Sequence, residues 1–108
     1  MPTLETRVPH RLSQQKAMAC VGEWLEQLKR ERQDVVSDME VTWDSALAEF
    51  HMRYQGLKVT GVLSATQTEI NAEVEIPLMA WPFKAKVKEF IEDTLGRELE
   101  ARAGISRD

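Results

Sequence analysis

The sequence lacks the features that mark several large classes of protein. Among 108 residues there is one cysteine, Cys20, so no disulfide can form within the chain, and a lone thiol suits a reducing compartment. Uncharged stretches such as 61–68 and 76–83 are far shorter than the roughly 20 apolar residues that a helix needs to cross a bilayer. We therefore expect no transmembrane segment.

A secretory signal and a basic surplus are also missing. The first 13 residues, MPTLETRVPHRLS, contain neither an apolar core nor a small-residue cleavage site, which predicts a cytoplasmic location. The 14 lysines and arginines are outnumbered by 18 aspartates and glutamates, for a net charge of -4. Because nucleic-acid binding usually needs a clustered basic face, we expect no nucleic-acid partner.

Motifs for catalysis, metals and cofactors are scarce. The two histidines have no His-x-x-x-His spacing, and no second cysteine is present to complete a metal site. His10 precedes a helix cap and is expected to anchor the entry of that helix. His51 alternates with apolar residues and is expected on a solvated sheet face. These patterns predict a protein that is not an enzyme and has no metal or cofactor.

The remaining candidates for chemistry have structural explanations. Cys20 falls on an apolar helical stripe, where burial would raise its pKa and make it inert. Glu69, Glu73 and Glu75 alternate along one strand and share a face, but an open sheet face favours cross-strand ion pairs over acid-base catalysis.

Apolar periodicity predicts an α+β fold with a single domain over residues 1–108. A helix is expected at about residues 13–32, with Ser13 as its N-cap. Period-two alternation then predicts four consecutive strands, at about residues 38–43, 49–55, 57–63 and 69–76. Helical spacing returns from Phe83 to Leu99, with Pro82 in the first turn.

The breaks between the strands are short, which favours an antiparallel meander. A weak alternation at residues 4–9 suggests a fifth strand, although residues 1–8 and 103–108 are expected to be frayed. The resulting architecture is a two-layer, helix-grip-like arrangement of order (β)αββββα. Both helices cover one face of a four- to five-stranded sheet. Gly56 suits a hairpin turn, and Gly61 suggests a bend or the close approach of a helix.

The run IPLMAWPF at residues 76–83 is the best candidate for an interaction surface. Ile76 continues the inward face of the last strand and Phe83 begins the inward stripe of the last helix, so both are expected in the core. Met18, Leu78, Met79 and Trp81 fall outside the periodic patterns and are expected to be exposed. We assign binding to a surface formed by Leu78, Met79, Trp81 and Phe83, with Phe90 nearby.

Five segments resemble the family of small polyhydroxyalkanoic acid system proteins, also called the polyhydroxyalkanoate granule region family. They are PHRLSQQKA (9–17), TWD (42–44), YQGLKVTGVLSA (54–65), EINAEVEIPL (69–78) and PFKAKVKEFIEDTLGREL (82–99). The resemblance covers about residues 6–102, and the chain departs from it in RERQDVVS (30–37) and in Trp81. It implies a bacterial setting near genes for polyhydroxyalkanoate synthesis or storage, and it implies no catalytic residues.

Two functions of different kinds follow. The first is a non-enzymatic accessory protein linked to polyhydroxyalkanoate synthesis or granules, which acts through an apolar surface on a granule or a protein partner. The alternative is a carrier of a small hydrophobic ligand or lipid, held in a groove between a curved sheet and the C-terminal helix. Exposed apolar residues would also suit a homodimer.

Overall fold

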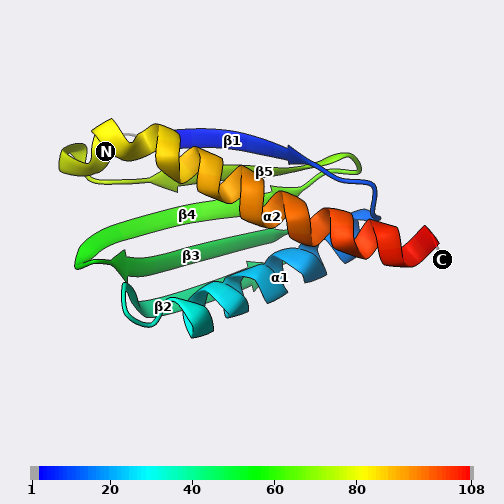
Figure 1. Ribbon diagram of the computed structural model, residues 1–108, viewed down its shortest axis with the longest axis horizontal. Helices are drawn as coiled ribbons and strands as arrows, with labels where there is room; N and C mark the ends of the chain where they lie inside the picture. Colours follow the sequence, from blue (N-terminus) through cyan, green and yellow to red (C-terminus); the bar gives the residue numbers. More distant parts are fainter. Residues whose placement is uncertain (1–2, 108) are drawn as a thin grey trace.

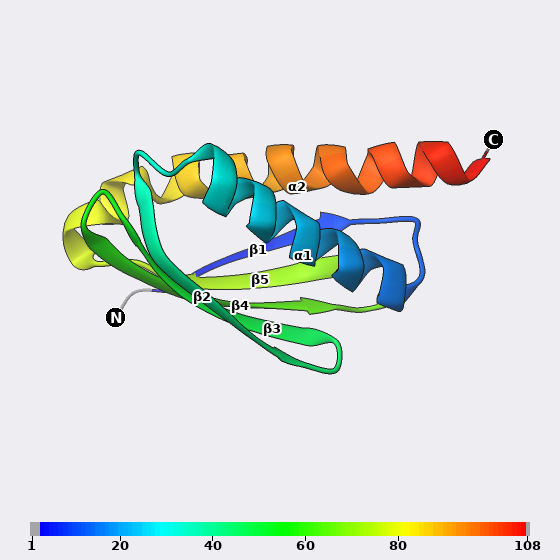
Figure 2. The ribbon, with the colours of Figure 1, turned by 90° about the horizontal axis from the view of Figure 1, so that it is seen from below.

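The computed structural model describes residues 3–107, with side chains as far as Arg102, and it confirms the α+β fold. The elements are β1 (Thr3–Pro9), α1 (Gln14–Glu31), β2 (Val36–Asp44), β3 (Leu47–Tyr54), β4 (Leu57–Ala65), β5 (Glu69–Glu75), the 3-10 helix η1 (Leu78–Phe83) and α2 (Lys84–Arg107). All five strands form one antiparallel sheet in the order β1-β5-β4-β3-β2 (Figure 1). Both helices lie on the same side of this sheet (Figure 2).

Residues 3–8 belong to the fold, contrary to our expectation that residues 1–8 are frayed, and the same expectation for residues 103–108 stays a prediction. β1 pairs with β5 along its whole length, and its residues Leu4 and Val8 are buried in the core. Pairing and burial together hold residues 3–8 in place, while residues 1 and 2 lie outside the described part. At the other end, α2 continues to Arg107.

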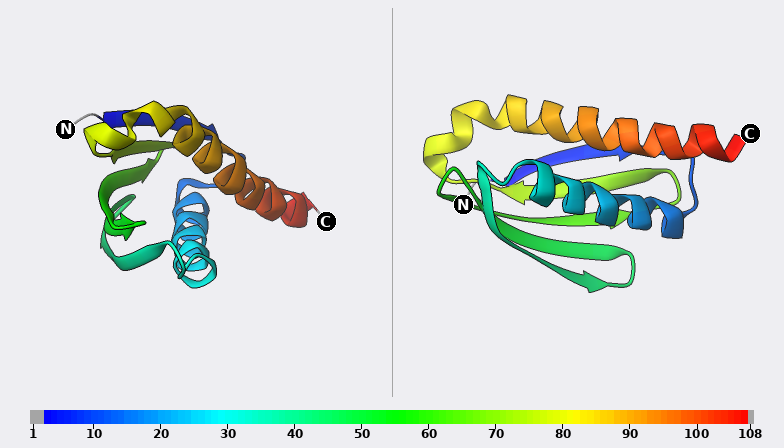
Figure 3. Two further views of the ribbon diagram at one scale, coloured as in Figure 1. Left: turned by 60° about the vertical axis from the view of Figure 1, so that its left-hand side comes forward. Right: turned by 60° about the horizontal axis from the view of Figure 1, so that its bottom comes forward.

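Small residues on the inner face of the sheet allow α1 to pack closely. Leu63 on β4 lies between Ala72 on β5 and Ala48 on β3, and all three are buried. From the helix side, Ala17 and Cys20 are fully buried. α1 therefore covers β4 and β2, and α2 lies along β1 and α1, so that the sheet curves around α1 (Figure 3).

Gly61 marks the tightest contact within the sheet. A Cβ atom at this position would lie 2.5 Å from Cε1 of Phe50 and 2.9 Å from the carbonyl oxygen of Glu73. Phe50 is the direct cross-strand partner of Gly61, so its ring fills the space above the glycine. The close approach that we expected from a helix is made by an aromatic ring of the neighbouring strand.

Backbone conformations with positive φ set the shape of β2 and of the β3–β4 hairpin. Gln55 and Gly56 have φ values of 50° and 82°, as the two central residues of a type I′ turn require. Within β2 the register shifts between Ser37 and Glu40, and Asp38 has a φ of 53°. This bulge brings Val36 and Met39 to the same buried face although they are three residues apart.

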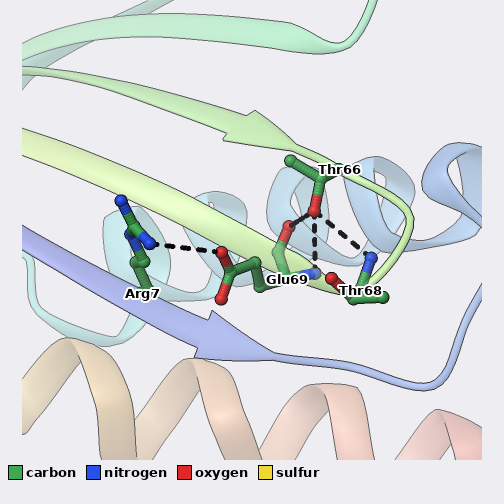
Figure 4. Close-up of polar contacts among 4 residues, drawn as sticks. All are labelled: Arg7, Thr66, Thr68 and Glu69. Carbon is green, nitrogen blue, oxygen red and sulfur yellow. Dashed lines mark hydrogen bonds and ion pairs between the residues drawn. The ribbon is translucent and has the colours of Figure 1, made fainter.

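Polar side chains hold the β4–β5 loop against the start of α1. The Thr66 hydroxyl accepts hydrogen bonds from the backbone N–H groups of Thr68 and Glu69, and the Glu69 carboxylate pairs with Arg7 (Figure 4). His10 links this loop to the helix entry: its Nδ1 accepts from the Leu12 N–H at 3.1 Å, and its Nε2 lies 3.0 Å from the Thr66 carbonyl oxygen. His10 thus has the anchoring role that its position predicted.

Candidate functional site

Two prolines determine the conformation between β5 and α2. Pro77 has an extended backbone and stands as the N-cap of η1, and Pro82 lies inside the short helix. Because proline has no N–H to give to a sheet ladder, the chain leaves the sheet here. The N–H of Ala80 donates to the Pro77 carbonyl at 2.9 Å and closes the first turn. α2 follows η1 without a break, with Lys84 as its first residue.

η1 carries three large apolar side chains that are exposed to solvent. Leu78, Met79 and Phe83 are 76%, 72% and 56% exposed, respectively. Our expectation for Leu78 and Met79 is therefore correct, and our assignment of Phe83 to the core is wrong. The 3-10 helix has about 3.0 residues per turn, so Phe83 does not fall on the inward stripe that a period of 3.6 assigns to it. We call these three residues the η1 patch.

Trp81, within η1, and Phe90, on α2, are half-buried against the core. Nζ of Lys84 lies 4.5 Å from the centre of the Trp81 ring, and Cζ of Arg32 lies 5.5 Å from the centre of the Phe90 ring. Each ring therefore makes a cation–π contact. The half-burial of Trp81 corrects our expectation that it is exposed with Leu78 and Met79.

Met18 is buried, which corrects our expectation that it is exposed. At 100° per residue Met18 falls on the flank of α1 that carries Leu25, and this flank faces β2. The opposite flank carries Trp24, whose indole N–H donates to the hydroxyl of Thr94 on α2 at 2.9 Å. Because the sheet covers one flank and α2 the other, the buried stripe of α1 is wider than one row of residues.

The titratable candidates lie apart from one another. Cys20 is fully buried, and burial raises the pKa of its thiol, an effect that the nearby charge of Arg102 opposes. His51 pairs with Glu40 at 3.2 Å on the solvated face of the sheet. Within the part of the chain that the structure describes, no three His, Cys, Asp or Glu side chains converge on a metal-sized site.

The glutamates of β5 also lie on the solvated face, as the alternation predicted. Glu75 accepts a hydrogen bond from the hydroxyl of Thr60 on β4, and Glu73 lies opposite Val62. Each contact is exposed, and none of the groups is enclosed in a cleft. This environment favours ordinary solvated carboxylates.

A groove of about 440 Å³ is lined by residues of α1 and β2. Leu25, Met39, Val41 and Trp43 contribute its apolar wall, and Glu26 and Lys29 lie at its rim. Trp43 is 48% exposed and its ring would touch a Cβ placed on Gly22 of α1. We expected a groove beneath the C-terminal helix and missed this one. The two residues that meet at this groove are Gly22 on α1 and Trp43 at the end of the inward-facing row of β2. Neither residue alone indicates a groove.

None of the helices in the described range is long and apolar enough to cross a membrane.

The fold and the surface together define a small α+β domain with an exposed apolar patch at one end of the sheet. The sequence profile of the polyhydroxyalkanoic acid system proteins matches residues 4–99. The chain therefore belongs to this family, as its motifs suggested.

Other comparisons add little. No curated protein matches the chain. Among solved structures, the crystal structure of TTHA0849 from Thermus thermophilus is 13% identical, with 99% of this chain and 100% of that chain covered and a TM-score of 0.41. A TM-score this low does not establish a shared fold, so the fold class is assigned from the strands and helices of this chain alone.

Proposed function

We propose that this protein is a non-enzymatic accessory protein of the polyhydroxyalkanoate system, which resides in the cytoplasm and attaches through the η1 patch to the surface of polymer granules. The observation that carries the proposal is the exposure of Leu78, Met79 and Phe83 on one short element. Exposed apolar side chains are common singly, but a contiguous group of this kind marks a contact surface. Family membership supplies the polymer as the setting.

The size of the patch favours an extended surface over a single protein partner. Full burial of a Leu, Met or Phe side chain is worth about 1.5–3 kcal/mol. Since the three residues are 56–76% exposed, their contact with an apolar surface would recover roughly 4 kcal/mol. Association of two proteins costs at least about that much in lost freedom. A granule offers many adjacent contacts, so that weak individual attachment still concentrates the protein there.

A role without catalysis is supported by the environment of each reactive group. The Cys20 thiol is buried and its pKa is raised, so it is a poor nucleophile. His51 and the β5 glutamates are solvated on an open face, where no cleft would hold a substrate.

Co-sedimentation with purified polymer granules tests the proposal. The variant Leu78→Ser/Met79→Ser/Phe83→Ser should lose most of its binding, because its apolar contact is removed. Leu47→Ser/Val62→Ser is the matched control, since these partly exposed residues lie on the opposite face of the sheet. Circular dichroism should show that both variants are folded. Unchanged binding of the triple variant would refute the site.

Two further outcomes of the same experiment point to other partners. If the protein pellets only in the presence of a granule protein, the patch is a protein-docking surface. If light scattering gives a dimer that the triple variant converts to a monomer, the patch is a dimer interface.

The groove between α1 and β2 suits a second candidate function, a carrier of a lipid or another small ligand that is only partly apolar. Its volume of about 440 Å³ lies in the range of ligand sites; polar atoms supply most of its open surface, and Val41 and Trp43 supply the exposed apolar part. Native mass spectrometry of protein purified from its own host should then show an added ligand mass. Replacement of Val41 by Glu should remove that mass, and a clean apo mass in the unchanged protein would refute the idea.

A further inference from the structure

We propose that the η1 patch and the lysines that follow it form a docking surface for an anionic lipid interface. This inference rests on the proposed function, because it names the chemistry of the surface that the same patch contacts. It is carried by the charges and rings around the patch.

The segment around the patch differs in charge from the rest of the chain. Residues 76–88, IPLMAWPFKAKVK, contain three lysines and no acidic residue, a local charge of +3. Because the whole chain carries -4, the remaining residues carry -7. Residues 76–88 thus carry a net positive charge beside the exposed apolar side chains, between the acidic neighbours Glu75 and Glu89.

The three lysines surround the first turns of α2. Lys84, Lys86 and Lys88 are all exposed. At 100° per residue, Lys84 and Lys88 lie on one flank of the helix and Lys86 lies on the other. Lysines at the start of a helix oppose the helix dipole, and neither η1 nor α2 has an acidic residue in its first turn. Their position is therefore not explained by helix stability.

The η1 patch, Trp81 and the three lysines follow the order of side chains found in a segment that lies at a lipid surface, with apolar residues deepest, aromatic residues next and cations outermost. The exposed η1 patch would enter the acyl region, and Trp81 would lie at the level of the headgroups, where tryptophan is enriched. Lys84, Lys86 and Lys88 would contact the phosphates. Lys84 covers Trp81, so the aromatic and cationic layers are adjacent.

The placement of η1 favours a lipid interface over an acidic protein. η1 lies at one end of the molecule, between the end of β5 and the start of α2 (Figures 1 and 3). The cations beside the patch are all lysines, which act as compact point charges, whereas recognition of particular protein carboxylates favours the planar fork of arginine. A projecting apolar tip with a cationic rim instead suits insertion into a soft, negatively charged layer.

Vesicle flotation of the full-length protein tests this inference. The vesicles consist of phosphatidylcholine alone, or of two parts phosphatidylcholine and one part phosphatidylglycerol. We expect binding to the mixed vesicles that weakens as salt is added. Each lysine near an anionic surface raises the partition constant about fivefold. The variant Lys84→Gln/Lys86→Gln/Lys88→Gln should therefore bind on the order of 100-fold more weakly.

A matched control makes the same change of net charge elsewhere. Arg11→Gln/Lys16→Gln/Arg97→Gln also removes three exposed positive charges, outside residues 76–88, and should bind the mixed vesicles within about twofold of the unchanged protein if binding is local. Equal losses in both triple variants would mean that net charge, and not this surface, attracts the protein, which would overturn the inference.

The lipid proposal and the granule proposal fail in different ways. If the protein binds lipid-free polymer beads through the η1 patch but binds neither vesicle, the lipid inference is wrong and the apolar attachment stands. Equal binding to neutral and anionic vesicles also overturns the anionic preference and leaves the attachment intact. If neither beads nor vesicles bind, both proposals are wrong.

Discussion

Replacement of Gly61 by alanine tests the closest contact in the sheet. The added Cβ would lie 2.5 Å from the Phe50 ring and 2.9 Å from the Glu73 carbonyl oxygen, whereas ordinary contacts begin at 3.4 Å. The ring can turn, but the carbonyl belongs to the paired backbone of β5. Overpacking of this kind costs about 1–3 kcal/mol. We expect a loss near the upper end, about 2–3 kcal/mol, and a melting temperature roughly 10–20 °C lower.

Gly96→Ala is the matched control, because the same methyl group is added where there is room for it. Its nearest neighbour is Cγ1 of Val8 at 3.8 Å, and the residue lies in the middle of α2. Alanine is favoured over glycine in a helix, so this variant should gain about 0.5–1 kcal/mol. Urea unfolding monitored by circular dichroism measures both changes in the free energy of unfolding.

A double variant separates the ring from the carbonyl. If Phe50 carries much of the clash, Gly61→Ala should cost about 1 kcal/mol less in a Phe50→Leu background than in the unchanged protein. The reasoning is refuted if Gly61→Ala changes the free energy of unfolding by less than about 0.5 kcal/mol. It is also refuted if Gly61→Ala and Gly96→Ala shift stability in the same direction.

Three further predictions concern buried polar groups. Thr94→Val leaves the Trp24 indole N–H without its partner and should cost about 1–3 kcal/mol in urea unfolding, and it should cost less in a Trp24→Phe background, where no indole N–H is left unpaired. Burial raises the pKa of Cys20, so the folded state keeps its thiol proton above the unfolded pKa of about 8.5. Stability should therefore fall as pH rises above about 8.5, and the fall should be smaller in Cys20→Ala. His10→Ala removes two hydrogen bonds to the backbone and should lower the free energy of unfolding by about 2 kcal/mol, against less than about 0.5 kcal/mol for the exposed His51→Ala.

The sheet and α1 could be predicted from the sequence because each has a single buried face. β3, β4 and β5 alternate strictly, and their two turns contain residues that suit short hairpins. The start of β2 could not be found in this way. The bulge at Asp38 places Val36 and Met39 three residues apart on one face, and no simple period of two describes that spacing.

The exposed surface was predicted in part, for reasons of local geometry. Leu78 and Met79 fall outside any period, and they are exposed. Phe83 was misplaced because the helical spacing of α2 was extended back to a residue that ends a 3-10 helix. Met18 was misplaced because the sequence does not show that the curved sheet also covers the flank of α1 that carries Leu25 and Met18.

The groove beside β2 depends on contacts between distant residues, which no local pattern contains. It forms where the side chains of α1 and β2 separate, and Trp43 reaches across to Gly22. A tryptophan at the end of a strand and a glycine in a helix are individually ordinary. Only their meeting in space indicates a site.

The bulge in β2 also affects how the molecule behaves among its own copies. β2 and β1 are the two edge strands, and α2 lies along β1. Open strand edges can template pairing with another chain, a route to aggregation. In β2 the left-handed backbone conformation of Asp38 interrupts the regular pairing with β3. The Asp38 carboxylate lies 3.8 Å from Nε of Arg53. The proposed attachment to granules would raise the local concentration of the protein, and the exposed edge of β2 thus carries a safeguard against forming continuous sheets.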